Sequence, residues 1–386
     1  MTRPHPRPRT GLRPRIAYLV THLMGSGHLV RTLALARVAA QAGAEALVIS
    51  GGRPLAHVDA TGVDLRQLPP LMSDGLDYRN LLRADGTPAG PEDYADRRAR
   101  IAALLRDAAP DALVCELHPF GRRSLAAEFE TAVEAAGAAP AWVSIRDVLE
   151  PPSRPKRVAR TLEALAPFRA VLIHGDAAAI PLEVSWPGPD AGPLPDAGLG
   201  RPLRYTGYVC APPPPAAPDG PGRGEVLVAT GGGAIGRALL EMAAHAAARS
   251  PLTWRLLVGG ADATAEAARL SALGPAMAEP ARADYREMMA RAAVSVSLAG
   301  YNTAVEAALS PTPALLVPME EGGEREQLIR AEAFSKLPGL ASARIGALTP
   351  ETPAERVDAL ARAPRIAAPL RADGAAESAR IILGDL

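Results

Sequence analysis

Residues 16–36 read IAYLVTHLMGSGHLVRTLALA and contain, in order, an apolar run, a glycine turn and an Ala/Leu-rich helical pattern. The unbroken apolar run Ile16–Val20 is typical of a strand that is buried on both faces of a parallel sheet. Gly25 and Gly27 allow a tight turn, and the predicted helix begins near His28. The stretch therefore predicts the first strand and helix of a doubly wound α/β domain.

The same alternation of apolar runs and Ala-rich helical stretches recurs along the chain. The predicted strands of the first half are Ile16–Val20, Ala46–Ile49, Ala112–Cys115, Trp142–Ile145 and Val171–Ile173, with helices that include Leu29–Ala42 and Ser124–Ala136. A second series of predicted strands comprises Val226–Ala229, Arg255–Val258, Val294–Leu298 and Ala314–Val317. Two such series predict an α/β protein with two doubly wound, Rossmann-like domains that face a cleft.

A length of 386 residues suits two domains of this kind. We expect a disordered arm over residues 1–14, an N-terminal domain over 15–209, a Pro-rich linker over 210–224 and a C-terminal domain over 225–386. The run Pro212–Pro215 can continue neither a strand nor a helix, which favours the linker. The last helix either stays with the C-terminal domain or packs back on the N-terminal one.

The composition excludes several classes of protein. Lys and Arg total 42, as do Asp and Glu, so the chain has no global attraction to nucleic acid. The two cysteines, Cys115 and Cys210, lack metal or redox spacing, and no stretch is apolar enough for a transmembrane helix. We expect a cytoplasmic protein, with peripheral attachment at the inner membrane face as the alternative.

Polar residues follow several predicted strands of the first half, at the sheet edge where α/β proteins bind ligands. These residues are His28, Glu116, His118, Arg146, Asp147, His174 and Asp176. His28 at a helix start is a candidate general base, with Glu116 or Asp147 as its orienting carboxylate. Arg146 binds an acceptor anion or forms a structural salt bridge, whereas Arg122 and Arg123 are assigned to a helix start or a solvated face. A structural turn capped by Ser26 is the alternative for the glycine turn.

The second half carries a further glycine turn and two polar helix starts. Gly231, Gly232 and Gly233 follow a strand, where backbone N–H groups and a helix dipole favour a pyrophosphate. Asn302, Thr303 and Glu306 open one helix, and Glu326 and Gln327 open another. A carboxylate suits the hydroxyls of a ribose and Gln suits a sugar, whereas a capping pair of Thr303 and Glu306 is the local alternative.

No Asp-x-Asp pair occurs anywhere in the sequence, and no His, Cys and Asp cluster has metal-ligand spacing. These absences favour a mechanism without a metal, in which helix dipoles stabilise a leaving diphosphate. We therefore expect neither a metal nor another cofactor.

These motifs resemble those of the two-domain GT-B glycosyltransferases, especially the MurG-like group that makes peptidoglycan lipid II. The glycine turn Gly25–His28 resembles the turn that opens the N-terminal domain of that group, and Gly231–Gly233 resembles its donor pyrophosphate loop. The resemblance implies that Glu306 binds the donor ribose and that Gln327, next to Glu326, contacts the donor sugar. The extended glycine turn of the group is shorter here, and the pyrophosphate loop differs after its glycines.

The chain is more similar still to a bacterial family of predicted glycosyltransferases with no assigned substrate. The shared motifs span roughly residues 15–335 and include Gly27-His28-Leu29-x-Arg31, Glu116-x-x-Pro119-Phe120-Gly121-Arg122, Ser144-x-Arg146-Asp147, His174-Gly175-Asp176, Tyr205-Thr206-Gly207-Tyr208 and Glu326-Gln327-Leu328-Ile329-Arg330-Ala331. Gly25, Gly27, Arg31, His118, Arg146, His174 and Asp176 are expected on the acceptor side.

The resemblance implies transfer of a hexosyl group from a nucleoside-diphosphate sugar to a hydroxyl acceptor with inversion, and the expected donor is a UDP-sugar. The acceptor is expected to be a lipid or a secondary metabolite, and no nucleic acid partner is expected. Two alternatives remain open: a nucleotide-sugar hydrolase or epimerase, and a non-catalytic protein that binds sugar nucleotides.

Overall fold

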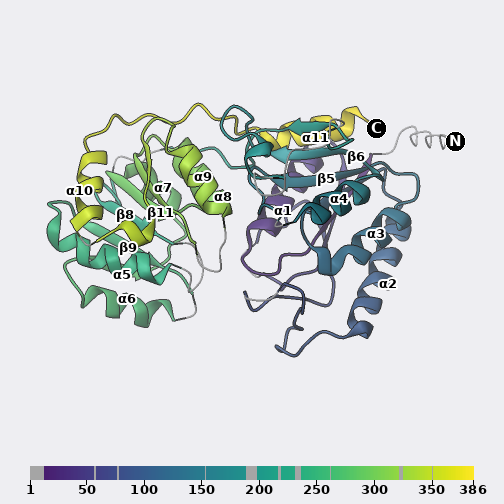
Figure 1. Cartoon of the computed structure of the whole chain (residues 1–386), viewed down its shortest axis with the longest axis horizontal. Helices are drawn as coiled ribbons and strands as arrows, with labels where there is room; N and C mark the ends of the chain where they lie inside the picture. The colour runs from purple at the N-terminus through teal and green to yellow at the C-terminus, as the bar shows by residue number, and fades with distance from the viewer. Residues whose placement is uncertain are drawn as a thin grey trace. The chain divides into compact units, whose positions relative to one another are not determined.

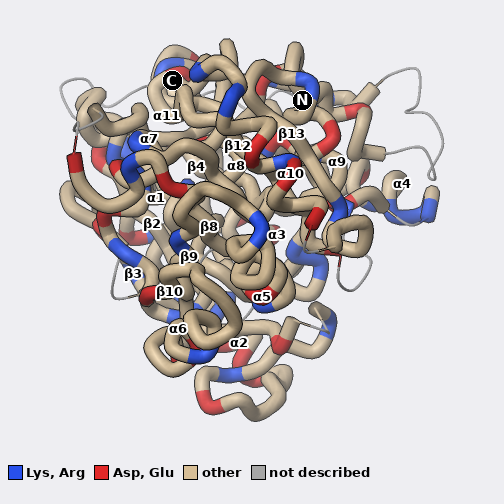
Figure 2. Tube along the Cα trace, turned by 90° about the vertical axis from the view of Figure 1, so that its left-hand side faces the viewer, with Lys and Arg blue, Asp and Glu red and all other residues tan. Residues whose placement is uncertain are grey.

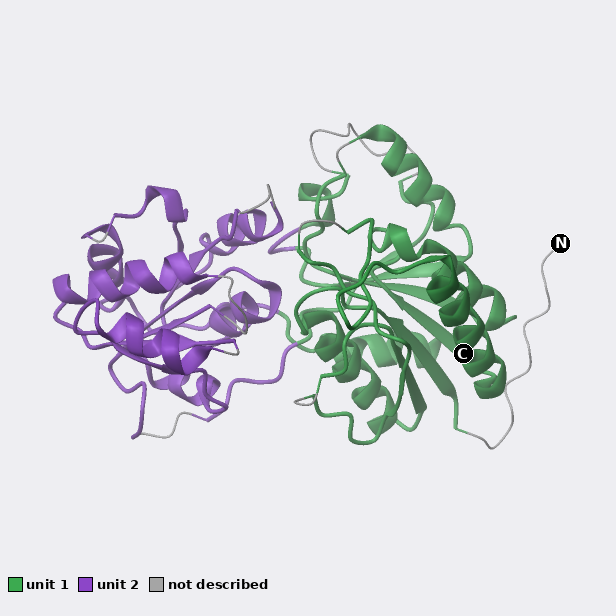
Figure 3. Ribbon diagram, turned by 90° about the horizontal axis from the view of Figure 1, so that it is seen from below, with its two compact units in different colours: residues 1–177, 181–209, 371–386 green, residues 178–180, 210–370 purple. Residues whose placement is uncertain are grey.

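Two fully parallel sheets organise the computed structural model of this chain, one in each of two compact units (Figure 3). Unit 1 comprises Met1–Ala177, Pro181–Val209 and Arg371–Leu386, and unit 2 comprises Ala178–Ile180 and Cys210–Leu370. The structure describes residues 13–55, 58–75, 78–152, 154–187, 198–215, 219–230, 236–260, 262–320, 325–349 and 351–386.

The sheet of unit 1 has seven strands in the order β3-β2-β1-β4-β5-β6-β7. Figure 1 labels two of them, β5 and β6. Its strands are β1 (Arg15–Val20), β2 (Glu45–Ser50), β3 (Asp64–Gln67), β4 (Ala112–Glu116), β5 (Ala141–Arg146), β6 (Phe168–His174) and β7 (Leu203–Tyr205). Its α-helices are α1 (Gly27–Gln41), α2 (Pro91–Ala108), α3 (Ala126–Ala135), α4 (Pro155–Ala164) and α11 (Gly374–Gly384). Short 3₁₀ turns lie at Arg123–Leu125 and Leu182–Val184.

Both faces of this sheet are covered, which explains why its central strands are apolar throughout. Along β1, Ala17 and Leu19 join the core that includes α2 and α3, whereas Tyr18 and its alternate neighbours join the core on the other face. That second core contains residues of α1 and of α11, which lie in contact. The C-terminal helix is therefore part of unit 1.

A buried ion pair fastens α2 to α3 in unit 1. The Arg97 guanidinium meets the Glu128 carboxylate through two hydrogen bonds of 2.7 and 2.8 Å, and neither side chain is more than 2% exposed. Arg97 also donates to the backbone oxygen of Gly51 at 2.9 Å, just after β2. A bidentate pair of this kind fixes both helices relative to the sheet.

The sheet of unit 2 has six strands in the order β10-β9-β8-β11-β12-β13. Its strands are β8 (Val226–Ala229), β9 (Trp254–Val258), β10 (Met277–Pro280), β11 (Val294–Leu298), β12 (Ala314–Val317) and β13 (Leu340–Ser342). Its α-helices are α5 (Arg237–Ala246), α6 (Ala263–Ser271), α7 (Tyr285–Arg291), α8 (Tyr301–Leu309), α9 (Glu326–Phe334) and α10 (Glu351–Leu360). Short 3₁₀ turns lie at Ala247–Arg249 and Ile345–Ala347.

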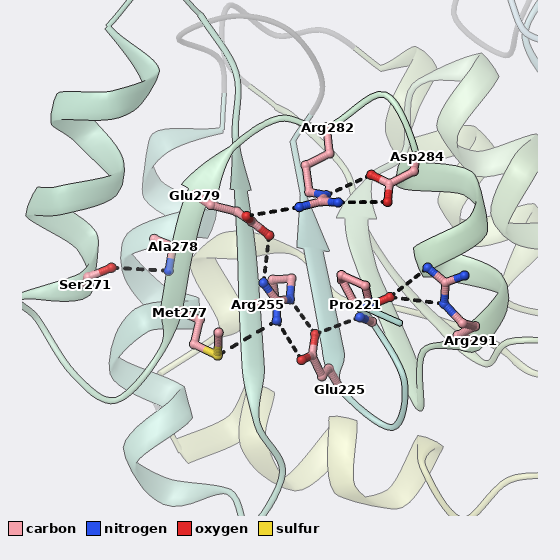
Figure 4. Close-up of polar contacts among 11 residues, drawn as sticks. Pro221, Glu225, Arg255, Ser271, Met277, Ala278, Glu279, Arg282, Asp284 and Arg291 are labelled. Carbon is pink, nitrogen blue, oxygen red and sulfur yellow. Dashed lines mark hydrogen bonds and ion pairs between the residues drawn. The ribbon is translucent and has the colours of Figure 1, made fainter. Parts of the chain in front are cut away.

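An ion-pair network joins β8, β9 and β10 of unit 2 (Figure 4). Arg255 on β9 donates to both oxygens of Glu225, at 2.5 and 2.8 Å, and to Glu279 on β10 at 2.7 Å. Arg282 lies 3.5 Å from Glu279 and bonds to Asp284 at 2.8 and 2.9 Å. The hydrogen bonding of Arg255 to Glu225 is the foremost cause that raises the pKa of Arg255 above its usual value.

The expected fold class is confirmed, because both sheets are parallel and alternate with helices. Each predicted strand is present, but β3, β7, β10 and β13 were not predicted. These four strands lie at or near sheet edges and are mostly half-buried or exposed, so their sequences lack the apolar run that marks a central strand.

Charges of both signs are interspersed along the described chain (Figure 2). None of the helices within the described ranges combines the length and the apolar character needed to cross a membrane. Most of the predicted arm and residues 216–218 of the predicted linker lie outside the described residues.

Candidate functional site

The order of strands places one topological switch point in each unit. In unit 1 the order reverses between β1 and β4, and in unit 2 between β8 and β11. Ligands of doubly wound proteins bind outside the carboxyl ends of the strands at such points, because the connections diverge there to opposite faces of the sheet. In unit 1, the residues at this point are His28 after β1 and Glu116 at the end of β4.

His28 and Glu116 are in direct contact although 88 residues separate them in the sequence. His28 Nδ1 lies 2.9 Å from Glu116 Oε1. An ionised carboxylate can only accept, so Nδ1 carries the proton and donates the 2.9 Å hydrogen bond to Glu116, and the Arg31 Nη2 that lies 3.3 Å from the same nitrogen is not its hydrogen-bond partner. His28 Nε2 is then left as an acceptor, and the His28 side chain keeps 14% of its surface exposed. This is the geometry of a general base held by an orienting carboxylate.

Arg31, one turn further along α1, completes this contact. Its Nη2 donates to the same Glu116 oxygen, and both side chains are almost fully buried. Burial alone raises the pKa of Glu116, but the charge of Arg31 and the hydrogen bonds from His28 and Ser144 outweigh it and hold that pKa well below its usual value. Glu116 is therefore an anion that orients His28.

The pKa of His28 lies well below its usual value of 6.5. Burial is the main cause, and the positive charges of Arg122, Arg146 and Arg31 add to it, whereas the bond to Glu116 acts in the opposite sense. A neutral imidazole at neutral pH is the form that can accept a proton.

The hydrogen-bonded cluster continues into the interior beyond Glu116. Ser144 Oγ lies 2.5 Å from Glu116 Oε2 and 2.9 Å from His174 Nε2. His174 Nδ1 lies in turn 2.9 Å from Thr206 Oγ1. His174 is fully buried, and that burial is the main cause that lowers its pKa to about 3. Five residues from different segments of unit 1 thus form one chain of contacts.

The remaining predicted residues of unit 1 lie in different surroundings. Asp147 is buried, and its Oδ1 accepts from the backbone N–H of Val148 at 2.8 Å, so the carboxylate that the structure places on His28 is Glu116. Arg146 ends β5 beside His174 in register. Asp176 Oδ2 lies 3.5 Å from the backbone nitrogen of Arg371, where the chain returns to unit 1.

His118 packs in the core and has no contact with His28 among those that the structure describes. Its ring stacks on Phe129 with 4.7 Å between ring centroids and is tilted against Phe168. Burial lowers the pKa of His118 to about 4. We conclude that His118 contributes to packing under α3, and its assignment to the acceptor side stays a prediction that this geometry does not favour.

The glycine turn has the local structure that the sequence predicts. Ser26 takes the position before α1, but its side chain makes no capping hydrogen bond, so the capping alternative does not explain the turn. Gly27 is the first residue of α1, and Gly25 lies in open space where an added Cβ would meet nothing within 4 Å.

Sequence reasoning missed the contribution of Arg122. Arg122 precedes the 3₁₀ turn Arg123–Leu125, but its side chain is half-buried and its Nε donates to the backbone oxygen of Thr21 at 2.6 Å. Burial, followed by repulsion from Arg146, lowers the pKa of Arg122 to about 10. Arg31, Arg122 and Arg146 thus surround His28 with more positive than negative charge. The motif Phe120-Gly121-Arg122 was the only signal in the sequence.

In unit 2 the predicted donor residues lie on α8 and α9. Glu306 faces Arg286 of α7, with 3.4 Å between Arg286 Nε and Glu306 Oε1. Burial raises the pKa of Glu306, and the charge of Arg286 acts against that shift. Gly300 takes the position before α8, so Thr303 does not cap the helix and the local capping alternative fails. Asn302 and Thr303 are half-buried in the first turn.

Glu326 and Gln327 begin α9 with different partners. Glu326 Oε1 accepts from Arg330 at 2.8 Å, and Arg330 also donates to the backbone oxygen of Ala299 at 3.0 Å. Gln327 Oε1 accepts from the backbone N–H of Met319 at 3.2 Å, after β12. That bond uses the amide oxygen of Gln327. Gly231, Gly232 and Gly233 lie outside the described residues.

Within the described ranges, no group of three or more His, Cys, Asp or Glu side chains could hold a metal ion. No protein-family model matches the sequence. No curated protein matches it either.

Solved structures of glycosyltransferases match this chain in fold. MurG from Acinetobacter baumannii matches with a TM-score of 0.59 and 16% identity over 95% of each chain. Glycosyltransferase VinC in complex with dTDP matches with a TM-score of 0.57 and 16% identity over 96% of each chain. UGT2 of Phytolacca americana, complexed with UDP-2-fluoro-glucose and pterostilbene, matches with a TM-score of 0.58 and 14% identity over 96% of this chain and 93% of that one. The chain has the GT-B fold of these enzymes.

Proposed function

We propose that this GT-B-fold chain is a glycosyltransferase. It moves a hexosyl group from a nucleoside-diphosphate sugar, UDP-linked, to a hydroxyl acceptor, with inversion and without a metal. The observation that carries the proposal is the pair of His28 and Glu116 at the β1/β4 switch point, 2.9 Å apart, with His28 Nε2 left as an acceptor. The nucleotides bound by VinC and UGT2 support the class of donor.

In this mechanism the acceptor hydroxyl gives its proton to His28 Nε2 while its oxygen attacks the anomeric carbon of the donor. A new carbon–oxygen bond forms, and the bond from that carbon to the diphosphate breaks with its electron pair on the diphosphate. The Glu116 carboxylate stabilises the imidazolium that results. A general base in this position contributes about 10²- to 10⁴-fold to the rate.

The donor is assigned to unit 2. Glu306 accepts from the ribose hydroxyls, Gln327 contacts the sugar and Asn302, Thr303 and Glu326 complete the site. Because Glu306 already lies 3.4 Å from Arg286, a bound ribose shares its carboxylate with that guanidinium. The amides of Gly231, Gly232 and Gly233 and the start of α5 bind the leaving diphosphate, which needs no further cofactor.

The acceptor is assigned to unit 1, around the glycine turn of Gly25 and Gly27. The excess positive charge of Arg31, Arg122 and Arg146 favours an acceptor that carries a phosphate or carboxylate. A lipid or a secondary metabolite with such a group fits this charge. A lipid acceptor would require peripheral attachment at the inner face of the membrane of an otherwise cytoplasmic protein.

The proposal is tested by thermal unfolding with UDP, dTDP, GDP and ADP and with their sugars. A donor nucleotide at about 100 times its Kd stabilises the native state by about 2.7 kcal/mol, which raises the unfolding temperature by several degrees. Glu306→Ala should reduce that shift strongly, whereas Glu241→Ala, at an exposed ion pair on α5, should leave it unchanged. No shift with any nucleotide would contradict the proposal.

Product analysis without an acceptor separates transfer from the alternative chemistry. A hydrolase would release free sugar and an epimerase would convert the donor sugar, whereas a transferase consumes its donor only when a hydroxyl acceptor is supplied. Nucleotide binding without any turnover would favour the non-catalytic alternative.

A further inference from the structure

We propose that Ser144, His174 and Thr206 are positioning residues that act on His28 through Glu116. Together with Glu116 and His28 they form a chain of five hydrogen-bonded residues, the hydrogen-bond relay. The relay runs in one direction and sets which nitrogen of His28 carries the proton. This inference deepens the proposed function, since it rests on His28 as the base.

The direction of the relay follows from the Glu116 carboxylate, which can only accept. Ser144 must therefore donate its single hydroxyl proton to Glu116 Oε2, over 2.5 Å. Its oxygen is then the acceptor for His174, so the proton of the His174 ring lies on Nε2, over 2.9 Å. Two contacts thus determine the tautomer of a residue that does not touch Glu116.

The far end of the relay is determined in the same way. A neutral His174 with its proton on Nε2 has a lone pair on Nδ1, which accepts from Thr206 Oγ1 at 2.9 Å. The other acceptors near this hydroxyl, the backbone oxygens of Gly207 and Ile173, lie farther away, at 3.0 and 3.2 Å. The full burial of His174 disfavours its charged form and keeps the ring neutral.

Parallel register brings the relay residues together. Glu116 lies opposite Ser144 in the β4–β5 pair, and His174 ends β6 two residues beyond the residue opposite Ser144. Thr206 follows β7 directly. Glu116, Ser144, His174 and Thr206 therefore lie at or near the carboxyl ends of neighbouring strands, so the relay runs from the switch point across the sheet toward β7.

Burial makes these bonds strong and their partners hard to exchange. Glu116 is 3% exposed and Ser144 1%, whereas His174 and Thr206 are fully buried. Hydrogen bonds in such surroundings are stronger than in water and polarise one another along a chain. With Oε2 held by Ser144, the Glu116 carboxylate cannot turn, and Oε1 stays on His28 Nδ1.

The consequence at the surface is a single tautomer of His28. Free imidazole favours the proton on Nε2, the nitrogen that an acceptor hydroxyl needs as its base. The relay reverses that preference by offering Nδ1 a fixed anion. A relay that served stability alone would not change the tautomer of His28 when it was broken at Ser144.

The test is ¹⁵N NMR of the histidine rings in the full chain at pH 7.5, without substrate. His28 should show one tautomer, with the proton on Nδ1, in the wild-type protein. Ser144→Ala should introduce at least about 10% of the Nε2-protonated form, because Glu116 loses the bond that holds Oε2 and keeps only that of Arg31 to Oε1. Ser144→Thr keeps the hydroxyl and should restore the single tautomer. Assignment of the His28 signal uses His28→Gln.

Matched controls separate the relay from general loss of a buried hydroxyl. Ser185 is fully buried and bonds to the backbone N–H of Leu149 at 3.1 Å, away from Glu116. Ser185→Ala should leave the His28 tautomer unchanged, as should Thr161→Val, whereas Thr206→Val should perturb His174.

If Ser144→Ala fails to fold, His174→Phe breaks the relay one step further in, and His174→Gln, which keeps a donor near Nε2, should restore it.

A second experiment measures transferase activity with the donor that the thermal-unfolding measurements identify. Ser144→Ala should lower kcat about 10-fold with little change in the KM for the donor, since the donor binds elsewhere. An unchanged His28 tautomer in Ser144→Ala and in His174→Phe would overturn the relay even if transferase activity is found. A responsive tautomer in a chain that binds no nucleotide would support the relay and overturn the proposed function.

Discussion

The relay of unit 1 and the ion-pair network of unit 2 both tie neighbouring parallel strands together, but they differ in position and in charge. The contacts of Arg255 with Glu225 lie toward the amino ends of the strands, since Glu225 directly precedes β8 and Arg255 is the second residue of β9, whereas Arg282 and Asp284 follow β10. Arg255 donates hydrogen bonds to two carboxylates (Figure 4). The relay lies at the carboxyl ends and contains neutral imidazoles, one of which keeps a free lone pair. Charged side chains that are paired with one another stabilise a sheet. A chain of hydrogen bonds that ends in an unprotonated imidazole nitrogen can instead take part in proton transfer.

The largest effect is expected from removal of the proposed base in unit 1. His28→Ala removes the base and should lower turnover about 10³-fold, with little effect on unfolding. Steady-state kinetics with the identified donor and acceptor measure it. His245→Ala, at an exposed position on α5, is the control and should turn over at the wild-type rate. A His28→Ala enzyme at full speed would remove His28 from the mechanism.

The next effect concerns stability in acid and is confined to unit 1. The pKa of His118 is about 4 in the folded protein and about 6.5 when unfolded, so folding excludes its proton. Its contribution to stability is complete above pH 6.5 and is lost as the pH falls toward 4, by about 3 kcal/mol. Hydrogen exchange of β4 to β6 should report this loss.

His118→Phe is the variant that tests this pH dependence, because a phenyl ring can stack on Phe129 without titrating. The difference in unfolding free energy between this variant and the wild type should shift in favour of the variant by about 3 kcal/mol between pH 6.5 and pH 4. His245→Phe should show a constant difference. A constant difference for His118→Phe as well would contradict the assignment.

Arg255→Met addresses the network of unit 2. It leaves the Glu225 and Glu279 carboxylates without their main partner, at sites where the side chains are 15% and 28% exposed. We expect a loss of about 2 kcal/mol in the unfolding free energy of unit 2, less than for a fully buried pair. Denaturant unfolding measures it, and Arg269→Met, at a more exposed pair, should cost much less. Equal losses would mean that burial of the network is irrelevant.

The smallest expected effect concerns the influence of neighbouring charges on the pKa of His28. The positive charge of Arg122 is the second cause, after burial, that lowers the pKa of His28. Arg122→Met should therefore raise that pKa and move the acid limb of the pH–rate profile to higher pH. The neighbouring, exposed Arg123→Met should leave the limb in place. A downward movement would refute the sign of this interaction.

Sequence patterns predicted the central strands because burial on both faces demands an unbroken apolar run, as in β1 and β4. They also named Glu116 as one of two candidate partners of His28, since both candidates follow strands. They could not choose between Glu116 and Asp147, because that choice depends on strand order, which places β4 and not β5 beside β1. The side-chain contact itself spans 88 residues.

Arg97 and Arg122 show a second limit of prediction from sequence patterns. Arg97 and Arg122 carry no local signal of burial, and each gains its partners only when distant segments meet: Arg97 with Glu128, and Arg122 with the backbone of Thr21. Ser144 and Thr206 lie in motifs that the sequence analysis quoted, but their link through His174 needs the register of β5, β6 and β7. The glycine loop after β8 lies outside the described residues and stays a prediction.

The return of the chain to unit 1 at Arg371 has a consequence for protein engineering. Because α11 supplies Ala379 and Ile382 to the core beside α1, neither unit corresponds to one uninterrupted stretch of the gene. A chimaera that replaces the segment Cys210–Leu370 of unit 2 must splice at two junctions and keep the native tail. A stop codon after Leu370 would strip a hydrophobic face from the half that holds His28.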